Sequence, residues 1–299
     1  MPEAMLRNRP VKISVIMPSY SQADYVEEAL LSALDQDYPH KEVLFLDGGS
    51  TDGTMEIVNR HRDRLAVCVS ERDDGQSDAM RKGFERASGD VLTWLNTDDI
   101  LLPGALAEVA RVFEGNPGCE WAFGNIVWID ADGAVIRCGR GEDWWPILPR
   151  VGTLTAAGPS AFFAKSLYDR VGGINLDLHY KMDTELWWRF AMAGARYHRL
   201  RRYTWAYRLH ETAKTAAPLF AGASDPTAAK THAARAAEQR QIEAMTKGFT
   251  THLPSPVTLP LRVAARIATP GYLRGFWESR HFRGRPIEQL MEALCPPAH

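Results

Sequence analysis

The sequence predicts an α/β protein with a mostly parallel, doubly wound sheet. Short apolar runs, which are typical of buried strands, alternate with amphipathic helical patterns. The strands are expected at 13–17, 43–46, 66–69 and 91–95, and the helices at 25–35, 54–62, 78–87 and 103–114. Because open α/β sheets bind ligands at the carboxyl ends of their strands, the functional residues are expected directly after the apolar runs.

The pattern changes in the second half of the chain. Apolar residues at 121–129 and 134–138 flank an Asp-Ala-Asp-Gly turn, which predicts a β-hairpin. A short strand at 162–164, helices at 166–171 and 184–193, and an alanine-rich helix at 226–247 follow. The expected organisation is an N-terminal tail at 1–10, an α/β domain at 11–215 with halves at 11–115 and 116–215, and a helical C-terminal extension at 216–299.

The composition is that of a cytoplasmic enzyme. Hydrophobic residues make up 45% and charged residues 24% of the chain, and the net charge of −2 argues against a general nucleic-acid binder. No apolar run approaches the length of a membrane span, and the first ten residues lack the long apolar stretch of a signal peptide, so neither feature is expected. The four cysteines have no C-x-x-C spacing, so reduced thiols are expected, with neither zinc nor disulfides.

Two adjacent carboxylates follow the fourth expected strand. The run Val91–Leu95 leads through Asn-Thr into Asp98 and Asp99. Paired carboxylates repel each other unless a cation lies between them, and few hard oxygen ligands suit Mg²⁺ or Mn²⁺ that carries a substrate's phosphates. The alternative interpretation is that the two aspartates cap the helix that begins near Pro103.

Polar residues also end the first two strands. Pro18, Ser19 and Tyr20 break the first strand into a loop, and Asp47 ends the second strand directly before Gly48. A carboxylate at that point can accept a hydrogen bond from a nucleobase N–H or a ribose hydroxyl.

Five segments, taken together, resemble family 2 glycosyltransferases of the GT-A fold, and they occur in that family's order and spacing. They are VIMPSYSQADYVEEALLSALDQDYP, FLDGGSTDGT, ERDDGQSDAMRKGFERASGDVLTWLNTDDILLPGAL, YKMDTELWWRFAMAG and YRLHETAKT, within residues 11–215. The resemblance implies a Rossmann-like, mostly parallel mixed sheet flanked by helices. It also implies an inverting, nonprocessive transferase that uses a nucleotide-sugar donor and Mn²⁺ or Mg²⁺.

The resemblance also assigns the donor site. Pro18, Ser19, Tyr20, Asp47 and Gly48 would border the nucleotide, with Ser19 and Asp47 at the base. Asp98 would contact the ribose and the metal side, and Asp99 would be the main metal ligand. His210 would complete the metal coordination or contact the diphosphate, to which Arg208 and Lys214 would add positive charge.

Two further aspartates are interpreted first as helix N-caps. Asp52 precedes the helix near Thr54, and Asp78 precedes the helix of residues 79–87. In similar transferases an aspartate at the place of Asp78 also borders the nucleotide, and Arg81 on the same turn could meet the base or the phosphates. The family often has Asn where Arg81 stands, which weakens the role implied for this residue.

The resemblance places the catalytic base at Asp183. The family usually has Glu-Asp here, and Met182 replaces the Glu. An inverting transfer needs one carboxylate to take the acceptor's proton and a cation to hold the departing phosphate, but no enzyme nucleophile. Asp183 can also cap the helix 184–193, and Glu185 is a weaker alternative base. Of the neighbours Trp187 and Trp188, one is expected in the core, and the other either lines an acceptor cleft or is also a core residue.

The expected reaction is transfer from a UDP-sugar, in preference to a dTDP- or GDP-sugar, to a growing surface polysaccharide or a lipid-linked saccharide. The acceptor rests on family analogy alone. Two alternatives are a sugar-phosphate nucleotidyltransferase and a catalytically inactive nucleotide-sugar-binding module. The first should carry a longer Gly-rich, basic loop than PSYSQADY, and the second is disfavoured by the full set of acidic residues and the histidine.

The C-terminal segment allows three interpretations. Residues 261–294 mix aromatic and aliphatic residues with several arginines, as in segments that lie on an anionic membrane surface. Such a contact would place the protein at the inner face of the membrane and suit a lipid-linked acceptor. The alternatives are a helical cap on the catalytic domain and a contact between copies of the chain in a homo-oligomer.

Overall fold

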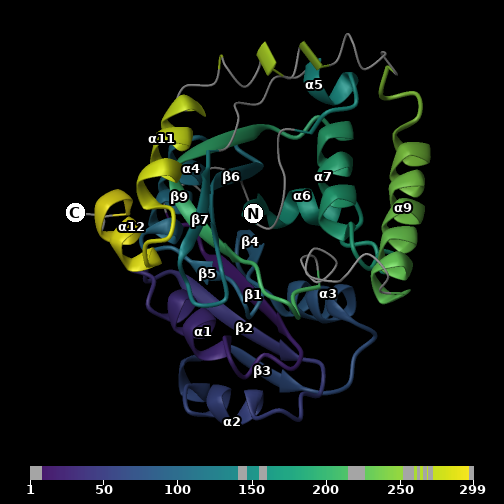
Figure 1. Cartoon of the computed structure of the whole chain (residues 1–299). Coiled ribbons are helices and arrows are strands. Elements are labelled where there is room, and N and C mark those ends of the chain that lie inside the picture. The colour runs from purple at the N-terminus through teal and green to yellow at the C-terminus, as the bar shows by residue number, and fades with distance from the viewer. Residues whose placement is uncertain are drawn as a thin grey trace.

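The computed structural model describes residues 9–140, 147–154, 160–214, 226–251, 259–260, 263–264, 268 and 272–295. Within these ranges the chain forms one mixed sheet with helices on both faces, and further helices lie at its C-terminal end (Figure 1). The expected linker at 216–225 lies outside the described residues, as does most of the segment between 252 and 271.

The described strands and helices follow the predicted order. The strands are β1 (Ile13–Ser19), β2 (Lys41–Asp47), β3 (Val67–Ser70), β4 (Val91–Trp94), β5 (Ile100–Leu101), β6 (Trp121–Ile129), β7 (Val135–Gly139), β8 (Ala161–Ala164) and β9 (Tyr197–Arg208). The helices are α1 (Val26–Leu34), α2 (Thr54–Asn59), η2 (Arg62–Arg64), α3 (Gln76–Arg86), α4 (Ala105–Gly115), α5 (Ile147–Arg150), α6 (Lys165–Arg170), α7 (Met182–Met192), α9 (Pro226–Thr246), α11 (Tyr272–Phe282) and α12 (Ile287–Leu294). The predicted α/β class is confirmed.

The sheet brings three strand ends to one edge. Its order is β3-β2-β1-β4-β8-β6-β9-β5, and β7 pairs with β6. β1 pairs in parallel with both β2 and β4, so that Ser19 lies opposite Asp47 and Ile16 opposite Trp94. β9 returns antiparallel to β5, where Trp205 lies opposite Leu101. The loops after β1, β2 and β4 and the segment after β9 therefore meet at one edge.

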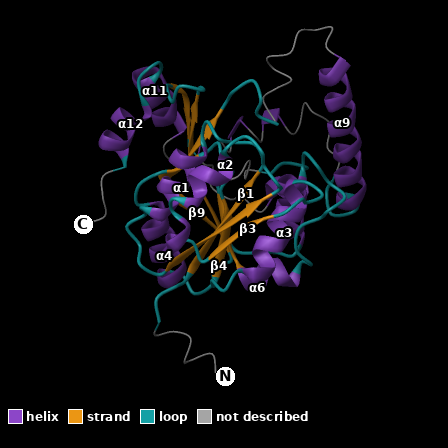
Figure 2. Cartoon of the chain, turned by 90° about the horizontal axis from the view of Figure 1, so that it is seen from below, coloured by secondary structure: helices purple, strands orange, loops and turns teal. Residues whose placement is uncertain are grey.

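Alternating side chains of β1 enter two different cores. Ile13, Val15 and Met17 face the side covered by α1 and α4, whereas Ile16 faces the side covered by α3 and α7. Figure 2 shows α1 and α4 on one side of the strands and α3 and α6 on the other. Burial on both faces explains why β1 is apolar almost throughout, without the polar alternation of a half-exposed strand.

Trp187 and Trp188 are both buried, and neither lines the main cavity. The Trp187 ring stacks on Trp94 with ring centroids 5.5 Å apart and 10° between the ring planes. Both side chains are therefore core residues, as one of the two interpretations expected, and neither contributes to the wall of this cavity.

The C-terminal helices pack on the sheet domain. Phe282 of α11 and Leu290 of α12 share a core with Val127 of β6 and Tyr203 of β9. The Tyr203 hydroxyl donates to Glu278 at 2.6 Å, and Arg140 pairs with the same carboxylate. α9 lies beside α7 (Figure 1). Within the described ranges the helices include none that is long and apolar enough to cross a bilayer.

Replacing Trp187 with alanine should lower the free energy of unfolding by about 3–5 kcal/mol, because a fully buried ring leaves a cavity. Urea denaturation of Trp187→Ala measures the loss. Trp277→Ala, which removes an exposed ring of the same size, is the matched control and should change stability by less than about 0.5 kcal/mol. Equal losses in the two variants would contradict this account of the core.

Candidate active site

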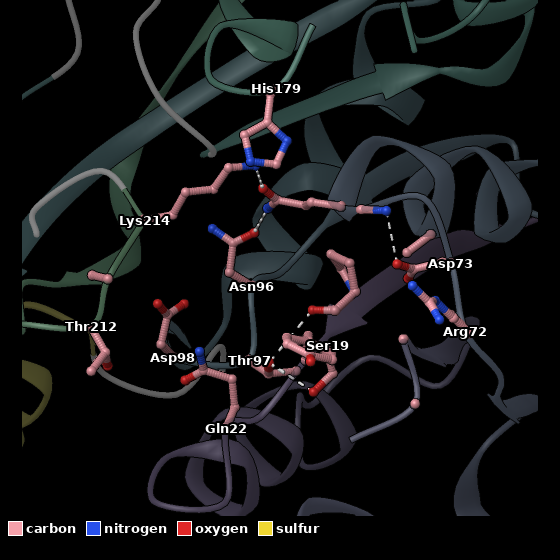
Figure 3. A pocket seen from close by; sticks show the side chains of 18 of the residues that line it. Ser19, Gln22, Arg72, Asp73, Asn96, Thr97, Asp98, His179, Thr212 and Lys214 are labelled. Atoms are coloured by element: carbon pink, nitrogen blue, oxygen red, sulfur yellow. Dashed lines mark hydrogen bonds between the residues drawn. The ribbon is translucent and has the colours of Figure 1, made fainter. Parts of the chain in front are cut away.

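A cavity of about 840 Å³ opens at the edge where the strand ends meet. The loops after β1, β2 and β4, the turn before α3 and the segment after β9 surround it (Figure 3). The lining residues are Pro18, Ser19, Tyr20, Gln22, Gly48, Gly49, Arg72, Asp73, Gly75, Gln76, Ala79, Asn96, Thr97, Asp98, His179, Tyr207, Thr212, Ala213 and Lys214. Of the predicted site residues, Pro18, Ser19, Tyr20, Gly48, Asp98 and Lys214 are in this set.

Three hydrogen bonds, each from a backbone N–H group to a side-chain oxygen, connect the loop after β1 to the segment after β2. The N–H groups of Ser21, Gln22 and Ala23 donate to Ser50 Oγ (2.7 Å), Thr54 Oγ1 (3.0 Å) and Asp52 Oδ2 (3.0 Å), respectively. Gly53, with φ of 95°, occupies the N-cap position predicted for Asp52. Asp52 Oδ1 nevertheless accepts the N–H of Thr54, the first residue of α2, at 3.1 Å, so its carboxylate both caps the helix start and holds the two loops together.

Asp47 does not face the cavity. Its carboxylate accepts hydrogen bonds from the N–H groups of Gly49 (3.1 Å) and Ser50 (2.9 Å) and from the hydroxyls of Ser50 and Ser70. These bonds shape the turn that brings Gly48 and Gly49 to the cavity wall. Its predicted contact with the nucleobase is not supported, because both carboxylate oxygens already have local donors.

Asp73 occupies the cavity wall beside Gly48. A Cβ at Gly48 would lie 2.9 Å from Asp73 Oδ2, so a larger residue at this position would require the Asp73 carboxylate to shift. Asp73 Oδ1 accepts the N–H of Gly75 at 2.9 Å, which fixes the turn before α3. Sequence reasoning missed Asp73, because one aspartate among several in a polar loop carries no distinguishing pattern.

Asp78 and Arg81 lie outside the lining set. Gly75, with φ of 103°, takes the N-cap position, so α3 begins at Gln76 and Asp78 lies inside the first turn. Asp78 pairs with Arg81 (2.7 Å) and Lys82 (3.1 Å), and Arg81 also pairs with Glu85 at 2.7 Å. The predicted nucleotide contacts of both residues are not supported, because their side chains bond to each other along α3.

Asp98 lines the cavity, and the buried His210 contacts it from outside the lining set. His210 Nε2 lies 3.2 Å from Asp98 Oδ2, and His210 Nδ1 lies 2.9 Å from Thr212 Oγ1. The imidazole is buried and packs on the Tyr25 ring at 4.7 Å. In Figure 3 the Asp98 carboxylate points into the open part of the cavity, on the side of Lys214. Two residues 112 positions apart in the sequence thus form one hydrogen-bonded pair.

Asp99 is buried, with 1% of its surface exposed, and does not line the cavity. Its Oδ1 accepts the N–H of Arg208 at 3.0 Å, and its Oδ2 accepts from Trp205 Nε1 (3.2 Å) and Asn96 Nδ2 (3.1 Å). Burial and the neighbouring charge of Asp98 raise the pKa of Asp99 well above its ordinary value. The prediction of Asp99 as the main metal ligand is not supported by this geometry, because three protein donors already use its oxygens.

Arg208 is also a buried structural group. Its guanidinium donates to the carbonyl oxygens of Asp98 and Ala131, both at 3.0 Å, and to Glu28. It lies over the Tyr25 ring at 4.9 Å. Its predicted contact with the diphosphate is not supported, since these bonds direct the side chain away from the cavity and toward the β6–β7 turn.

Lys214 supplies the positive charge that lines the cavity near Asp98. Its Nζ donates to Gln76 Oε1 at 3.2 Å, and Gln76 Nε2 donates to Asn96 Oδ1 at 2.8 Å (Figure 3). Burial lowers the pKa of Lys214 to about 8, against the opposing influence of the Glu238 and Asp183 charges. The ammonium is therefore largely charged at pH 7 and loses its charge in mildly alkaline solution.

Asp183 lies in the first turn of α7, next to but not within the lining set. Burial raises the pKa of its carboxyl group, and its negative charge in turn raises the pKa of Lys214. The interpretation of Asp183 as the N-cap of a helix at 184–193 is wrong, because α7 begins at Met182 and Lys181 holds the N-cap position. Both oxygens of Glu185, the alternative base, bond to Arg189.

The turn that leads into α7 is capped by a residue of the C-terminal extension. The buried carboxylate of Glu238, on α9, accepts the N–H groups of His179 (2.8 Å), Tyr180 (2.9 Å) and Lys181 (2.8 Å). His179 lines the cavity, and burial together with the Lys214 charge lowers its pKa, so the imidazole is neutral at pH 7. No local pattern around Glu238 in an alanine-rich helix indicates this contact.

About half of the chain matches the model of a known protein family. Residues 14–162 match the model of the family described as glycosyl transferase family 2. The chain belongs to glycosyl transferase family 2.

Several curated proteins resemble the family 2 segment. The chain is 40% identical over 90 residues to a putative teichuronic acid biosynthesis glycosyltransferase of Bacillus subtilis, which covers 29% of this chain and 36% of that protein. It is 31% identical over 120 residues to the GalNAc(5)-diNAcBac-PP-undecaprenol beta-1,3-glucosyltransferase of Campylobacter jejuni, over 39% of this chain and 38% of that protein. The chain thus spans well under half the length of these two relatives.

Solved structures support the GT-A fold. A complex of S. aureus TarS (residues 1–349) with UDP-GlcNAc matches with a TM-score of 0.52 and 20% identity, over 67% of this chain and 59% of that chain. The Pyrobaculum calidifontis mannosyltransferase PcManGT, in complex with GDP-Man and Mn²⁺, matches with a TM-score of 0.51 and 20% identity, over 92% and 86%. The predicted fold is confirmed.

Replacing Glu238 with glutamine should destabilise this family 2 chain by about 1–3 kcal/mol, because a charged acceptor of three N–H groups becomes neutral. It should also lower the pKa of Lys214 further, since the Glu238 charge raises that pKa. Thermal unfolding and the pH dependence of nucleotide binding measure the two effects. Glu243→Gln, an exposed position on the same helix, is the control and should change neither.

Proposed function

We propose that the chain is a metal-dependent, inverting glycosyltransferase that moves a sugar from a nucleotide-sugar donor, with a UDP-sugar expected first, to a saccharide or lipid-linked saccharide acceptor. The observation that carries the proposal is Asp98, which lines the cavity, contacts the buried His210 and shares the cavity wall with Lys214. This arrangement offers a cation site and a separate positive charge where a parallel sheet binds ligands.

The nucleoside is proposed to bind where the loops after β1 and β2 meet. Ser19, Tyr20, Gly48 and Asp73 line this part of the cavity. The Tyr20 ring is exposed and free to stack on a base, and the Asp73 carboxylate can accept a base N–H or a ribose hydroxyl. The three hydrogen bonds between the two loops hold this part in shape before the donor arrives.

The residues around Asp98 fit a divalent cation that is held jointly with a diphosphate. The described residues include no group of three or more His, Cys, Asp or Glu side chains that could hold a metal alone. Asp98 and His210 would supply two ligands, and Mg²⁺ and Mn²⁺ commonly take the remainder from substrate phosphates and water. Such a cation, when bound, stabilises the negative charge of the departing phosphate. Lys214 is placed to neutralise the same charge.

Asp183 is the proposed general base. In one displacement, the acceptor oxygen forms a bond to the anomeric carbon, the bond from that carbon to the phosphate oxygen breaks, and the acceptor proton passes to Asp183. The raised pKa of Asp183 makes it a stronger base than an ordinary carboxylate. Glu238 fixes the backbone of the turn before Asp183, so the extension helps to position the base.

A donor screen tests the proposal. UDP, GDP, dTDP and CMP are added with and without Mn²⁺ or Mg²⁺, and melting temperatures are compared for wild type, Asp98→Asn and Asp132→Asn. One nucleotide should stabilise the wild type and the turn control Asp132→Asn only with metal, and Asp98→Asn should lose this effect. The wild type should release nucleotide diphosphate from the matching nucleotide-sugar, whereas a nucleotidyltransferase would release pyrophosphate. The proposal would be overturned if no combination of nucleotide and metal ion stabilised the wild type.

The pH profile of kcat/KM should be bell-shaped. Activity should rise as Asp183 loses its proton, above the ordinary pKa of an aspartate, and fall as Lys214 loses its proton near pH 8.

Lys214→Arg should retain donor binding and remove the fall near pH 8, because the guanidinium stays charged. Asp183→Asn should bind donor normally and turn over at least about 100-fold more slowly. An unchanged alkaline limb in Lys214→Arg would contradict the role of Lys214.

A further inference from the structure

One face of α11 presents three large apolar side chains to solvent. Leu273, Phe276 and Trp277 are 67%, 64% and 67% exposed, and their spacing places them on one face of the helix. The opposite face of α11 is attached to the protein, because Phe282 is buried and Ser279 Oγ bonds to the N–H (2.9 Å) and carbonyl (3.0 Å) groups of Cys138. Contiguous exposed apolar surface of this kind marks an interaction site.

A second, basic cavity of about 570 Å³ lies beside this helix. Four arginines, from the residue after β7, from β9 and from α11, line it together with residues of β9 and α12. The set is Arg140, Arg199, Arg201, Tyr203, Arg274, Ala293 and Leu294. Arg140 and Arg274 share the buried carboxylate of Glu278 at 2.8 Å and 3.0 Å. Four arginines thus line the cavity, and Glu278 pairs with two of them, Arg140 and Arg274.

We propose that α11 and the basic cavity together dock the protein on a membrane leaflet that contains anionic phospholipid. Leu273, Phe276 and Trp277 enter the boundary between headgroups and acyl chains, and the arginine cavity takes the phosphate of a lipid headgroup. Helices that lie in a membrane interface combine such an apolar face with arginines beside it. Residues 272–286 contain four arginines and one glutamate, which extends the positive charge along the helix.

The charge of the surface favours a lipid leaflet over a protein partner. Guanidinium groups bind phosphate in a bidentate manner, and basic side chains near an anionic leaflet each add about 1 kcal/mol of attraction. Tryptophan prefers the membrane interface, where its ring is apolar and its N–H is polar. Neither step involves the donor cavity, so docking is independent of sugar transfer.

Vesicle co-sedimentation of the full chain, without metal or nucleotide, tests the proposal. The protein should sediment with vesicles of phosphatidylcholine and phosphatidylglycerol, but not with phosphatidylcholine alone, and added salt should weaken the binding. Phe276→Ser/Trp277→Ser and Arg201→Glu should each weaken partitioning about tenfold. Phe276→Leu/Trp277→Phe should retain binding, because it keeps the apolar face.

Matched controls separate docking from loss of folding. Leu176→Ser changes another exposed apolar residue. Arg60→Glu reverses a charge at the C-terminal end of α2, which lies far from α11 (Figure 1). Both variants should therefore bind vesicles like the wild type. All variants should keep the wild-type melting temperature and the nucleotide-induced shift. The proposal would be overturned if the wild-type protein did not sediment with anionic vesicles, even if inorganic phosphate raised its melting temperature. Equal vesicle binding by the serine double variant, or dimerisation through α11 without vesicle binding, would also overturn it.

Discussion

The buried carboxylate of Asp99 is the interaction on which the arrangement of the site depends. It bonds to Asn96 in the loop after β4, and to the Trp205 side chain and the Arg208 backbone N–H on β9. These hydrogen bonds fix the end of β9 against the end of β4, so that His210 Nε2 lies 3.2 Å from Asp98 Oδ2. A buried carboxyl group is costly unless hydrogen-bond donors surround it, and here the donors belong to the two segments that must be held together.

The fold could be predicted from the sequence because its signals are local. The apolar run of β1 and the periodic pattern of α1 each lie within one short segment, and the alternation of such segments defines the sheet. Ser19, Gly48 and Asp98 lie on the cavity wall because they follow the strand ends of a parallel sheet, which converge, whereas the resemblance alone pointed to Lys214. The roles of adjacent residues could not be predicted in this way. Asp98 and Asp99 differ only in which side of the chain they face, and partners more than 100 residues away decide this.

The same limit applies to Asp47, Arg208 and Glu238. Asp47 and Arg208 have the charge expected of ligand-binding groups, but hydrogen bonds to neighbouring segments use that charge within the protein. Glu238 has a role near the site that its local sequence does not indicate, because it reaches the turn before α7 from a helix of the C-terminal extension. The C-terminal extension therefore has two proposed roles. Glu238 of α9 fixes the turn before the proposed base, and α11 carries the proposed membrane-binding surface.

The most direct test of this account is a Mn²⁺ titration in the presence of UDP, followed by electron paramagnetic resonance, on wild type, Asp98→Asn and Asp99→Asn. The account predicts that Asp98→Asn folds with an unchanged melting temperature and loses Mn²⁺ binding. It predicts that Asp99→Asn melts at a lower temperature but, while folded, still binds Mn²⁺. Loss of binding in folded Asp99→Asn, with binding retained in Asp98→Asn, would contradict it.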